Sequence, residues 1–346
     1  VVFSQFNTRW TYSELLDKCD AFAAGLLALG LYKGDRVGIW SPNRAEWIIT
    51  QIATARLGII LVNINPAYKG TELEYCINKV DLKCLIFATQ FKSSAYAQTI
   101  LDLCPELVEQ KPGYLNLKKL PSLRSLVQIS ETPIAGAFAF QDIIKKGTTG
   151  YFERLDHISN SLRPDDAINI QFTSGTTGAP KGATLSHKNI INNAVSCAKA
   201  MKLTNQDRLC IPVPLYHCFG MVLGTLACCA AGATMIFPSE GFEPDKTMRA
   251  LKQENCTAVH GVPTMFSAML ASSEFEGKPI KSLRTGIMAG SQCPEVLMRR
   301  VLYDLGCSEM TIGYGMTETS PISFQSDVND PVDVRVSTVG RIQPHC

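Results

Sequence analysis

Hydrophobic positions along the first ninety residues alternate between helical spacing and short buried runs. The stretch TYSELLDKCDAFAAGLLALG has helical spacing, with Thr11 as its N-cap and Gly30 as its closing glycine. Strands are predicted within KGDRVGIWSPN, IILVNIN and CLIFA, and helices at EWIITQIATARLG and TELEYCINKVD. This succession of βα units predicts an α/β fold with a mostly parallel sheet, wound on both faces.

Two weakly patterned stretches interrupt this alternation. Residues Cys104–Ser122 carry Pro, Gly and Lys and predict a surface excursion, and residues Thr148–Asp166 predict a polar linker. We therefore expect a soft boundary near residues 150–165. It would divide the chain into a first βα lobe at 1–160 and a second lobe at 161–346, which contains the candidate chemistry.

The segment Leu209–Ser239 contains no Asp, Glu, Lys or Arg and is long enough to cross a bilayer. Prolines and glycines break it up, so it predicts a loop (PVPLYHCFG), a small-residue helix (MVLGTLACCA), a turn at Ala231-Gly232 and a strand (ATMIF). No transmembrane segment is expected.

Composition narrows the classes of protein further. Hydrophobic residues make up 46% and charged residues 18% of the chain, and the formal net charge is +2. This balance is typical of a globular protein, and the absence of a basic stripe gives no reason to expect a nucleic-acid partner. The thirteen cysteines form no CxxC pair, so we expect buried thiols in a reducing compartment. The stretch that begins at Val1 resembles a strand and not a targeting peptide, so we do not expect these residues to reveal the location of the protein.

The clearest chemical feature is a glycine- and hydroxyl-rich loop directly after the predicted strand INIQF. Its glycines allow a tight turn and close approach to a ligand, its hydroxyls and backbone N–H groups can surround an anion, and its lysine adds positive charge. It lacks the Gly-Lys-Ser/Thr ending of a P-loop. The loop predicts polyphosphate binding, with a plain surface turn as the alternative. Its residues are Thr173, Ser174, Gly175, Thr176, Thr177, Gly178, Ala179, Pro180, Lys181 and Gly182.

These ten residues, TSGTTGAPKG, resemble the phosphate-binding signature of the adenylate-forming (AMP-binding) enzymes, which include acyl-CoA synthetases, luciferase-like enzymes and adenylation domains of peptide synthetases. The stretches KGDRV, NPAY and VGRIQPH also resemble that family, and in particular its medium-chain acyl-CoA ligases. The resemblance implies the large N-terminal domain of that fold. It also implies ATP and Mg²⁺ in the site, fatty acid and coenzyme A as further substrates, and mitochondrial residence.

A second stretch, Tyr314-Gly315-Met316-Thr317-Glu318, resembles the family's YGxTE motif. The resemblance implies that Thr173–Lys181 hold the β- and γ-phosphates of ATP, that Tyr314 stacks on adenine, and that Thr317 donates to the α-phosphate. It also implies that Glu318 supplies a carboxylate oxygen to Mg²⁺.

Further positions are implied by the same resemblance. His217, in PLYHCFG, would lie beside the substrate carboxylate and the α-phosphate, although a lone histidine among apolar residues is often a core residue. Gly290-Ser291-Gln292 would form the adenine-binding turn, with a plain turn at a strand end as the alternative. Small residues at His260–Pro263 and Gly315 would leave room for an acyl chain.

The family reaction has two steps, adenylation of a carboxylate by ATP and transfer of the acyl group to coenzyme A. The family's ribose-binding Asp, hinge Arg and lid Lys would follow Cys346, so we expect this chain alone to bind nucleotide weakly at best. An amino-acid substrate is disfavoured because Cys218 stands where amino-acid-activating members place an Asp. Aryl acids and a non-catalytic nucleotide-binding relative stay open as alternatives.

Overall fold

The computed structural model describes residues 1–173 and 180–344, which divide into two compact units. The first unit comprises Thr11–His187, and the second comprises Val1–Trp10 together with Lys188–Cys346. The boundary therefore lies at residue 187, not near residue 160, and the first ten residues belong with the C-terminal part. The reason is strand pairing, because β1 (Val2–Phe3) lies parallel to β11 (Thr234–Phe237).

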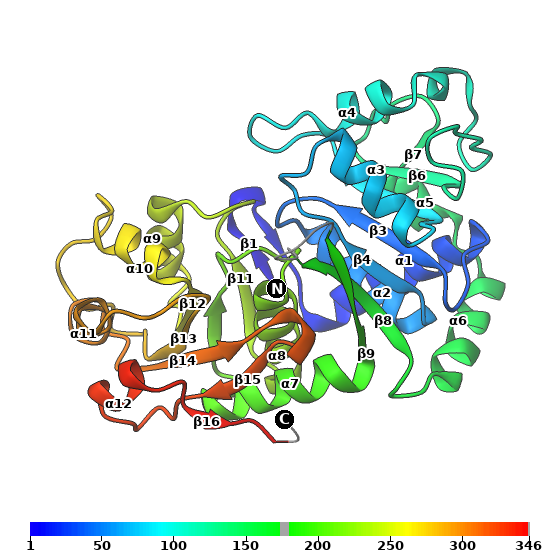
Figure 1. Cartoon of the computed structure of the whole chain (residues 1–346). Coiled ribbons are helices and arrows are strands. Elements are labelled where there is room, and N and C mark those ends of the chain that lie inside the picture. Colours follow the sequence, from blue (N-terminus) through cyan, green and yellow to red (C-terminus); the bar gives the residue numbers. More distant parts are fainter. Residues whose placement is uncertain (174–179, 345–346) are drawn as a thin grey trace. The chain divides into compact units, whose positions relative to one another are not determined.

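The first unit is a seven-stranded sheet in the order β7-β6-β5-β3-β4-β8-β9, parallel except for the antiparallel β9. The strand order advances from β3 to β4 and then reverses to β5, so right-handed crossovers put α2 and α3 on opposite faces. Figure 1 shows this two-sided cover. In chain order, the elements of this unit are α1 Tyr12–Ala28, β3 Arg36–Trp40, α2 Ala45–Leu57, β4 Ile60–Asn63, α3 Gly70–Lys79, β5 Cys84–Ala88, α4 Tyr96–Leu103, η2 Pro105–Glu109, β6 Ser125–Ile129, β7 Ala137–Ala139, α5 Phe140–Lys146, α6 Thr149–Ser161, β8 Ala167–Thr173 and β9 Lys181–Ser186.

The second unit is a nine-stranded sheet in the order β16-β15-β14-β13-β12-β10-β11-β1-β2. Its central strands are parallel, and β2, β15 and β16 join antiparallel at the ends. Its elements, besides β1 and β11, are η1 Ser4–Phe6, β2 Thr8–Arg9, α7 His187–Ala200, β10 Arg208–Cys210, η3 Phe219–Leu226, α8 Ala227–Ala231, α9 Pro244–Gln253, β12 Ala258–Gly261, α10 Pro263–Leu270, β13 Thr285–Ala289, α11 Glu295–Tyr303, β14 Glu309–Gly315, η4 Thr317–Thr319, β15 Ile322–Gln325, α12 Val332–Ser337 and β16 Arg341–Ile342.

The predicted first helix is present as α1, and its start follows from local chemistry. The Thr11 side chain accepts a hydrogen bond from the Glu14 N–H at 3.1 Å, and the Glu14 carboxylate accepts from the Thr11 N–H at 2.7 Å. This reciprocal capping fixes the helix start. Gly30, with φ +77°, follows the helix end in the left-handed conformation that favours glycine.

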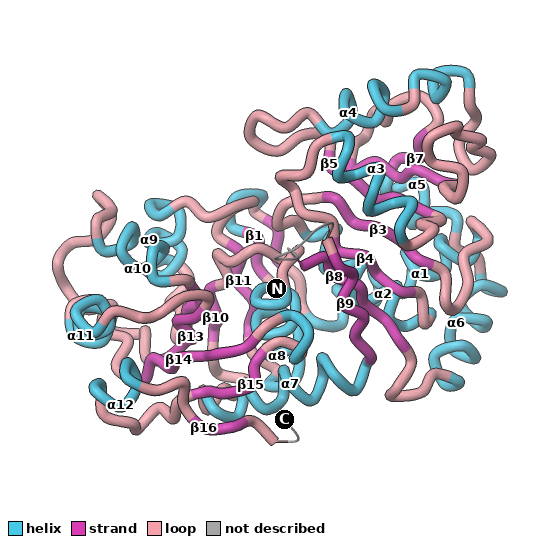
Figure 2. Tube along the Cα trace, in the orientation of Figure 1, coloured by secondary structure: helices cyan, strands magenta, loops and turns pink. Residues whose placement is uncertain are grey.

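Both stretches expected to be irregular contribute more structure than the pattern indicates. Residues 149–161 form the helix α6, whose one fully buried side chain, Leu155, leaves almost no apolar period to detect. The segment after α4 does run largely as loop (Figure 2), yet Leu107, Leu115 and Leu117 are buried in the core of the first unit. The surface-excursion prediction was therefore wrong for these leucines.

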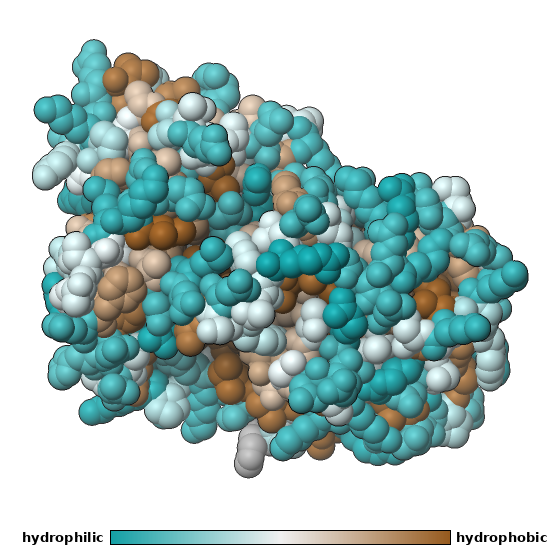
Figure 3. All heavy atoms as spheres, turned by 180° about the vertical axis from the view of Figure 1, so that it is seen from behind, coloured by the Kyte–Doolittle hydropathy of each residue, from teal (hydrophilic) through white to brown (hydrophobic). Residues whose placement is uncertain are grey.

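The uncharged segment 209–239 folds into the short elements that its prolines and glycines predict. A loop leads into the π-helical η3 and the short α8, then Gly232 turns the chain with φ +70° into β11. Among the residues that the structure describes, no helix has the length and apolarity needed to cross a membrane. Hydrophilic residues cover most of the face seen in Figure 3, with hydrophobic residues between them in small groups.

The twelve cysteines of the described residues are reduced thiols, and all but Cys229 are buried. Burial raises the pKa of the Cys84 thiol to about 12. These thiols therefore pack as small apolar side chains, as the sequence predicts.

Candidate functional site

The candidate residues of the second unit follow the carboxyl ends of its parallel strands. Gly290 follows β13, Met316 follows β14, and the segment leading to His217 follows β10. In open α/β sheets, ligands bind at this edge because loops from neighbouring strands meet there. The fold thus gathers residues that are separated by about a hundred positions in sequence.

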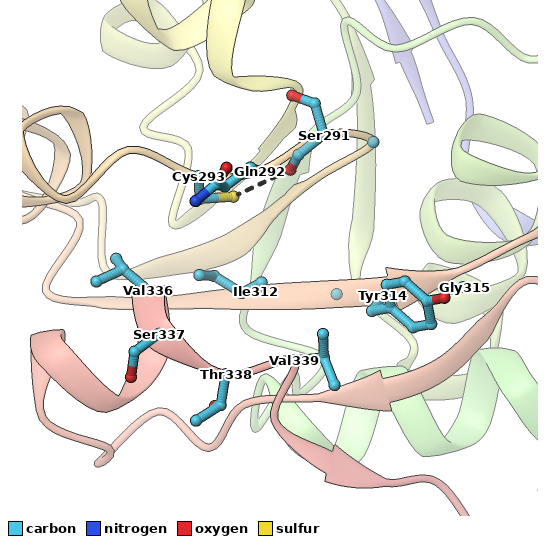
Figure 4. A pocket seen from close by; sticks show the side chains of 12 residues that line it. Ser291, Gln292, Cys293, Ile312, Tyr314, Gly315, Val336, Ser337, Thr338 and Val339 are labelled. Carbon is cyan, nitrogen blue, oxygen red and sulfur yellow. Dashed lines mark hydrogen bonds between the residues drawn. The ribbon is translucent and has the colours of Figure 1, made fainter.

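A pocket of about 530 Å³ opens at this edge. One wall is the turn after β13, another is the end of β14, and a third is the end of α12 with the two residues that follow it (Figure 4). The lining residues are Gly290, Ser291, Gln292, Cys293, Ile312, Gly313, Tyr314, Gly315, Val336, Ser337, Thr338 and Val339. The structure therefore joins the predicted Gly290–Gln292 turn and the first two residues of the YGMTE motif, Tyr314 and Gly315, in one cavity, which is large enough for a planar heterocycle.

Tyr314 supplies the exposed aromatic surface of the pocket. Its side chain is 50% exposed, and its ring is 6.1 Å from the ring of Phe324, which supports it from β15. Across the pocket, Gly290 has φ +92°, which allows the chain to turn sharply at the end of β13. A flat, accessible ring opposite a turn that begins with glycine suits a planar ligand.

The turn after β14 depends on a close approach of two backbone segments. A Cβ atom added to Gly315 would lie 1.8 Å from the carbonyl oxygen of Pro321. That same carbonyl oxygen accepts hydrogen bonds from the Met316 N–H at 3.0 Å and the Thr319 hydroxyl at 2.6 Å. Glycine is therefore required at position 315 so that the chain can fold back and present Thr317 and Glu318.

Cys218 connects two predicted site residues. Its Sγ atom lies 3.9 Å from Oγ1 of Thr317 and 3.7 Å from Nδ1 of His217. Thr317 and Cys218 are buried, whereas Glu318 is exposed. The segment after β10 and the turn after β14 are thus in contact, and His217 and Thr317 both lie within 4 Å of one thiol.

His217 has a defined orientation and proton position. Its Nδ1 atom accepts a hydrogen bond from the Phe219 N–H at 3.1 Å, so the neutral ring carries its proton on Nε2. The ring is exposed, but the protein atoms packed around it lower the pKa of the imidazole. At neutral pH His217 is therefore a neutral donor, able to orient an anionic oxygen.

The third wall of the pocket was not predicted from the sequence. It is held by Arg335, a buried guanidinium that donates to the carbonyl oxygens of Asp330 at 2.7 Å, Met310 at 2.8 Å and Val328 at 2.6 Å. Burial lowers the pKa of Arg335. A single arginine in DVRVS has no local signature for this role, because its partners lie on another strand and loop.

The predicted phosphate loop belongs to the first unit, where only its two ends are described. β8 and β9 form an antiparallel hairpin in which Thr173 pairs with Lys181. The Tyr75 hydroxyl donates to the Pro180 carbonyl oxygen at 3.1 Å, and Lys181 is exposed. Residues Ser174, Gly175, Thr176, Thr177, Gly178 and Ala179 lie outside the described residues.

His260, expected near an acyl chain, is fully buried between strands. Its Nε2 atom lies 3.0 Å from the Leu223 carbonyl oxygen, and its Nδ1 atom accepts from the Ile287 N–H at 3.3 Å. Burial lowers the pKa of the ring to about 4. Its two ring nitrogens thus link β12 to η3 and β13, which is a structural role.

The carboxylates, thiols and imidazoles of the described residues form no ready-made metal site. In residues 1–173 and 180–344, no three or more His, Cys, Asp or Glu side chains are grouped so that they could hold a metal ion. Glu318 offers an exposed carboxylate on the turn after β14. This fits Mg²⁺, which takes few protein carboxylates and completes its octahedron with water and phosphate oxygens.

Comparison with known proteins places this geometry in a family. The AMP-binding enzyme profile matches residues 1–346. The Bacillus subtilis protein YngI is 44% identical over 345 residues, covering 100% of this chain and 63% of that protein. The mitochondrial medium-chain acyl-CoA ligases ACSF2 of Danio rerio and Homo sapiens are 43% and 40% identical, and the chain covers 57% and 56% of them. The chain thus spans about three fifths of the length of these relatives.

Solved structures share the fold. The N-terminal domain of FACL13 from Mycobacterium tuberculosis matches with a TM-score of 0.82 and 21% identity, over 99% of this chain and 78% of that one. The anthranilate CoA ligase AuaEII, in complex with anthranoyl-AMP, matches with a TM-score of 0.81 and 23% identity, over 99% of this chain and 61% of that one. From its full-length profile match, its relatives and its architecture, the chain belongs to the AMP-binding enzyme family.

Proposed function

We propose that this protein activates a carboxylic acid with ATP and passes the acyl group to coenzyme A. In the first step a carboxylate oxygen attacks the α-phosphorus of ATP, and the bond to pyrophosphate breaks, leaving an acyl-adenylate. In the second step the thiol sulfur of coenzyme A attacks the acyl carbon and AMP leaves, while the thiol proton passes to solvent.

The pocket beside β14 is the observation that supports this proposal most. It combines the exposed ring of Tyr314 with the turn at Gly290 in a volume of about 530 Å³. Adenine has a flat π-face and hydrogen-bonding edges, which this combination suits better than an aliphatic ligand. Membership of the AMP-binding family agrees with a nucleotide at this position.

The remaining roles follow from the chemistry of each side chain. Lys181 and the hydroxyls of its loop would bind the β- and γ-phosphates. The Nε2–H of His217 would orient the attacking carboxylate, and the Thr317 hydroxyl would donate to the α-phosphate. Glu318 would hold Mg²⁺, which when bound neutralises charge on the phosphates.

Medium-chain fatty acids are the substrate class we propose, and mitochondria the location. Both rest on the names of the vertebrate relatives, at about 40–43% identity. A Bacillus subtilis protein is similar to the same degree, so the location has the narrower support.

A substrate screen tests this proposal on the protein at its natural length. AMP release and thioester formation are measured with acids from short to long chains and with aryl acids. We expect both products, with the highest kcat/KM for medium chains and at least a tenfold loss in the Lys181→Ala variant. Lys111→Ala removes an exposed lysine of the same unit and should change little. Products with aryl acids alone would overturn the substrate class, and no products with any acid would overturn the proposal.

A further inference from the structure

Asn193 is a buried side chain on α7 that bonds both polar groups of one distant residue. Its Nδ2 atom donates to the Ile322 carbonyl oxygen at 2.7 Å, and its Oδ1 atom accepts from the Ile322 N–H at 3.1 Å. The side chain is 6% exposed, and the two residues are 129 positions apart in sequence. An amide is suited to this task because it carries a donor and an acceptor side by side.

Ile322 anchors the turn formed by residues 314–319. It starts β15 and pairs with Gly315 across an irregularity in strand register between Tyr314 and Gly315. Its neighbour Pro321 accepts the hydrogen bonds from Met316 and Thr319 that shape the turn. The position of Ile322 therefore sets the position of the whole segment 314–319.

We propose that Asn193 is a positioning residue for nucleotide binding, acting through Ile322 on Tyr314 and Thr317. The inference rests on the proposed function, since it assigns to α7 the alignment of the adenine- and α-phosphate-binding groups. Asn193 is not among the residues that line the pocket. Without these two hydrogen bonds, Ile322 loses its attachment to α7, and the irregular register at Tyr314–Gly315 allows the turn to shift relative to β13.

Kinetic constants for ATP distinguish positioning from a general loss of folding. Asn193→Leu keeps the volume of the side chain and removes both bonds, and Asn192→Leu is the matched control at the exposed neighbouring position. In acid-dependent ATP–pyrophosphate exchange by the natural-length protein, we expect Asn193→Leu to raise the KM for ATP at least fivefold. Asn192→Leu should stay within twofold of the original protein. Loss of stability alone would lower kcat with the folded fraction and leave this KM unchanged, and that result would overturn the proposal.

Amide hydrogen exchange supplies a readout that does not depend on activity. In Asn193→Leu we expect the amides of 316–322 to exchange at least tenfold faster, while those of α9 keep their rates. If Asn193→Leu does not fold, Asn193→Asp replaces it in the same measurement. An ionised carboxylate accepts a hydrogen bond from the Ile322 N–H but cannot donate one to the Ile322 carbonyl oxygen. Unchanged exchange in 316–322 would overturn the positioning role. Absence of catalysis by the unaltered protein would instead overturn the proposed function. Amide hydrogen exchange would then still show whether Asn193 positions the segment 316–322.

Discussion

Tyr314 and Gly315 show how two adjacent residues make opposite contributions to one site. Tyr314 offers an exposed face to a ligand, whereas Gly315 contributes by having no side chain where two backbones touch. The sequence motif indicates both residue types. It does not reveal that Pro321 is the contact of Gly315, because that contact depends on how the chain folds back.

Replacing Tyr314 with alanine should weaken nucleotide binding. Loss of one base–aromatic stack costs about 1–3 kcal/mol, which corresponds to a roughly 5- to 150-fold higher Kd for MgATP. Titration calorimetry measures this change. Tyr303→Ala is the control, since Tyr303 is 64% exposed on α11 and does not line the pocket. Equal affinities in the two variants would place the nucleotide elsewhere.

Replacing Gly315 with alanine should destabilise the second unit. The new Cβ would approach the Pro321 carbonyl oxygen to 1.8 Å, and overpacking of this kind costs about 1–3 kcal/mol or more. We expect a lower Tm by thermal unfolding. Gly150→Ala, in helix α6 with no heavy atom within 4 Å of the added Cβ, should leave Tm equal or slightly higher. A Gly315→Ala protein as stable as this control would contradict the close approach.

Elements with strong local signals were predicted correctly, whereas a helix with little apolar period and the pairing of distant strands were not. The helix after Thr11 and the strand CLIFA match α1 and β5, because capping and apolar period are local properties. α6 was missed because it buries only Leu155 fully. The pairing of β8 with β4 joins residues about a hundred positions apart, and no local pattern specifies such a choice.

The segment 326–339 is an element whose shape depends on one buried guanidinium. Replacing Arg335 with methionine keeps the length of the side chain but leaves the carbonyl oxygens of Asp330, Met310 and Val328 without this donor. Unsatisfied buried acceptors cost about 1–3 kcal/mol each, so we expect a lower Tm and weaker MgATP binding. Arg299→Met, at a half-exposed pair with Glu295, should change Tm little. Unchanged MgATP binding in Arg335→Met would show that the position of α12 does not affect nucleotide binding in the pocket.

The two units follow one plan, in which the carboxyl ends of parallel strands present loops. The sequence predicts this α/β plan but not the division at residue 187, because the strand before the phosphate loop carries the same signals whichever sheet it joins. Nor does it predict that Val1–Trp10 belongs to the second unit. That assignment needs the pairing of β1 with β11, more than two hundred positions away.

Acid should destabilise the molecule through carboxylates that are paired at the sheet ends. Hydrogen bonds from Arg9 lower the pKa of Glu254, and those from Arg341 lower the pKa of Asp330. A lowered folded-state pKa stabilises the native state above the unfolded-state value, and this stability is lost as pH falls through the folded-state value. We expect Tm to be flat near neutral pH and to fall below about pH 4.5.

The Glu254→Gln variant tests this contribution. Its Tm should be lower than that of the original protein at pH 7, and the difference should shrink as the pH falls through the lowered pKa of the original carboxylate, which then becomes protonated. Glu153→Gln, at an exposed position of α6, should follow the original curve throughout. A constant difference across the pH range would rule out the charge of Glu254 as the cause.

The central claim is that the protein forms an acyl-adenylate from ATP. Exchange of labelled pyrophosphate into ATP by the natural-length protein measures this step directly, without coenzyme A. We predict label in ATP only when a fatty acid is present, and a strong reduction in Tyr314→Ala. Exchange that is absent, or that proceeds equally without any acid, would contradict the account.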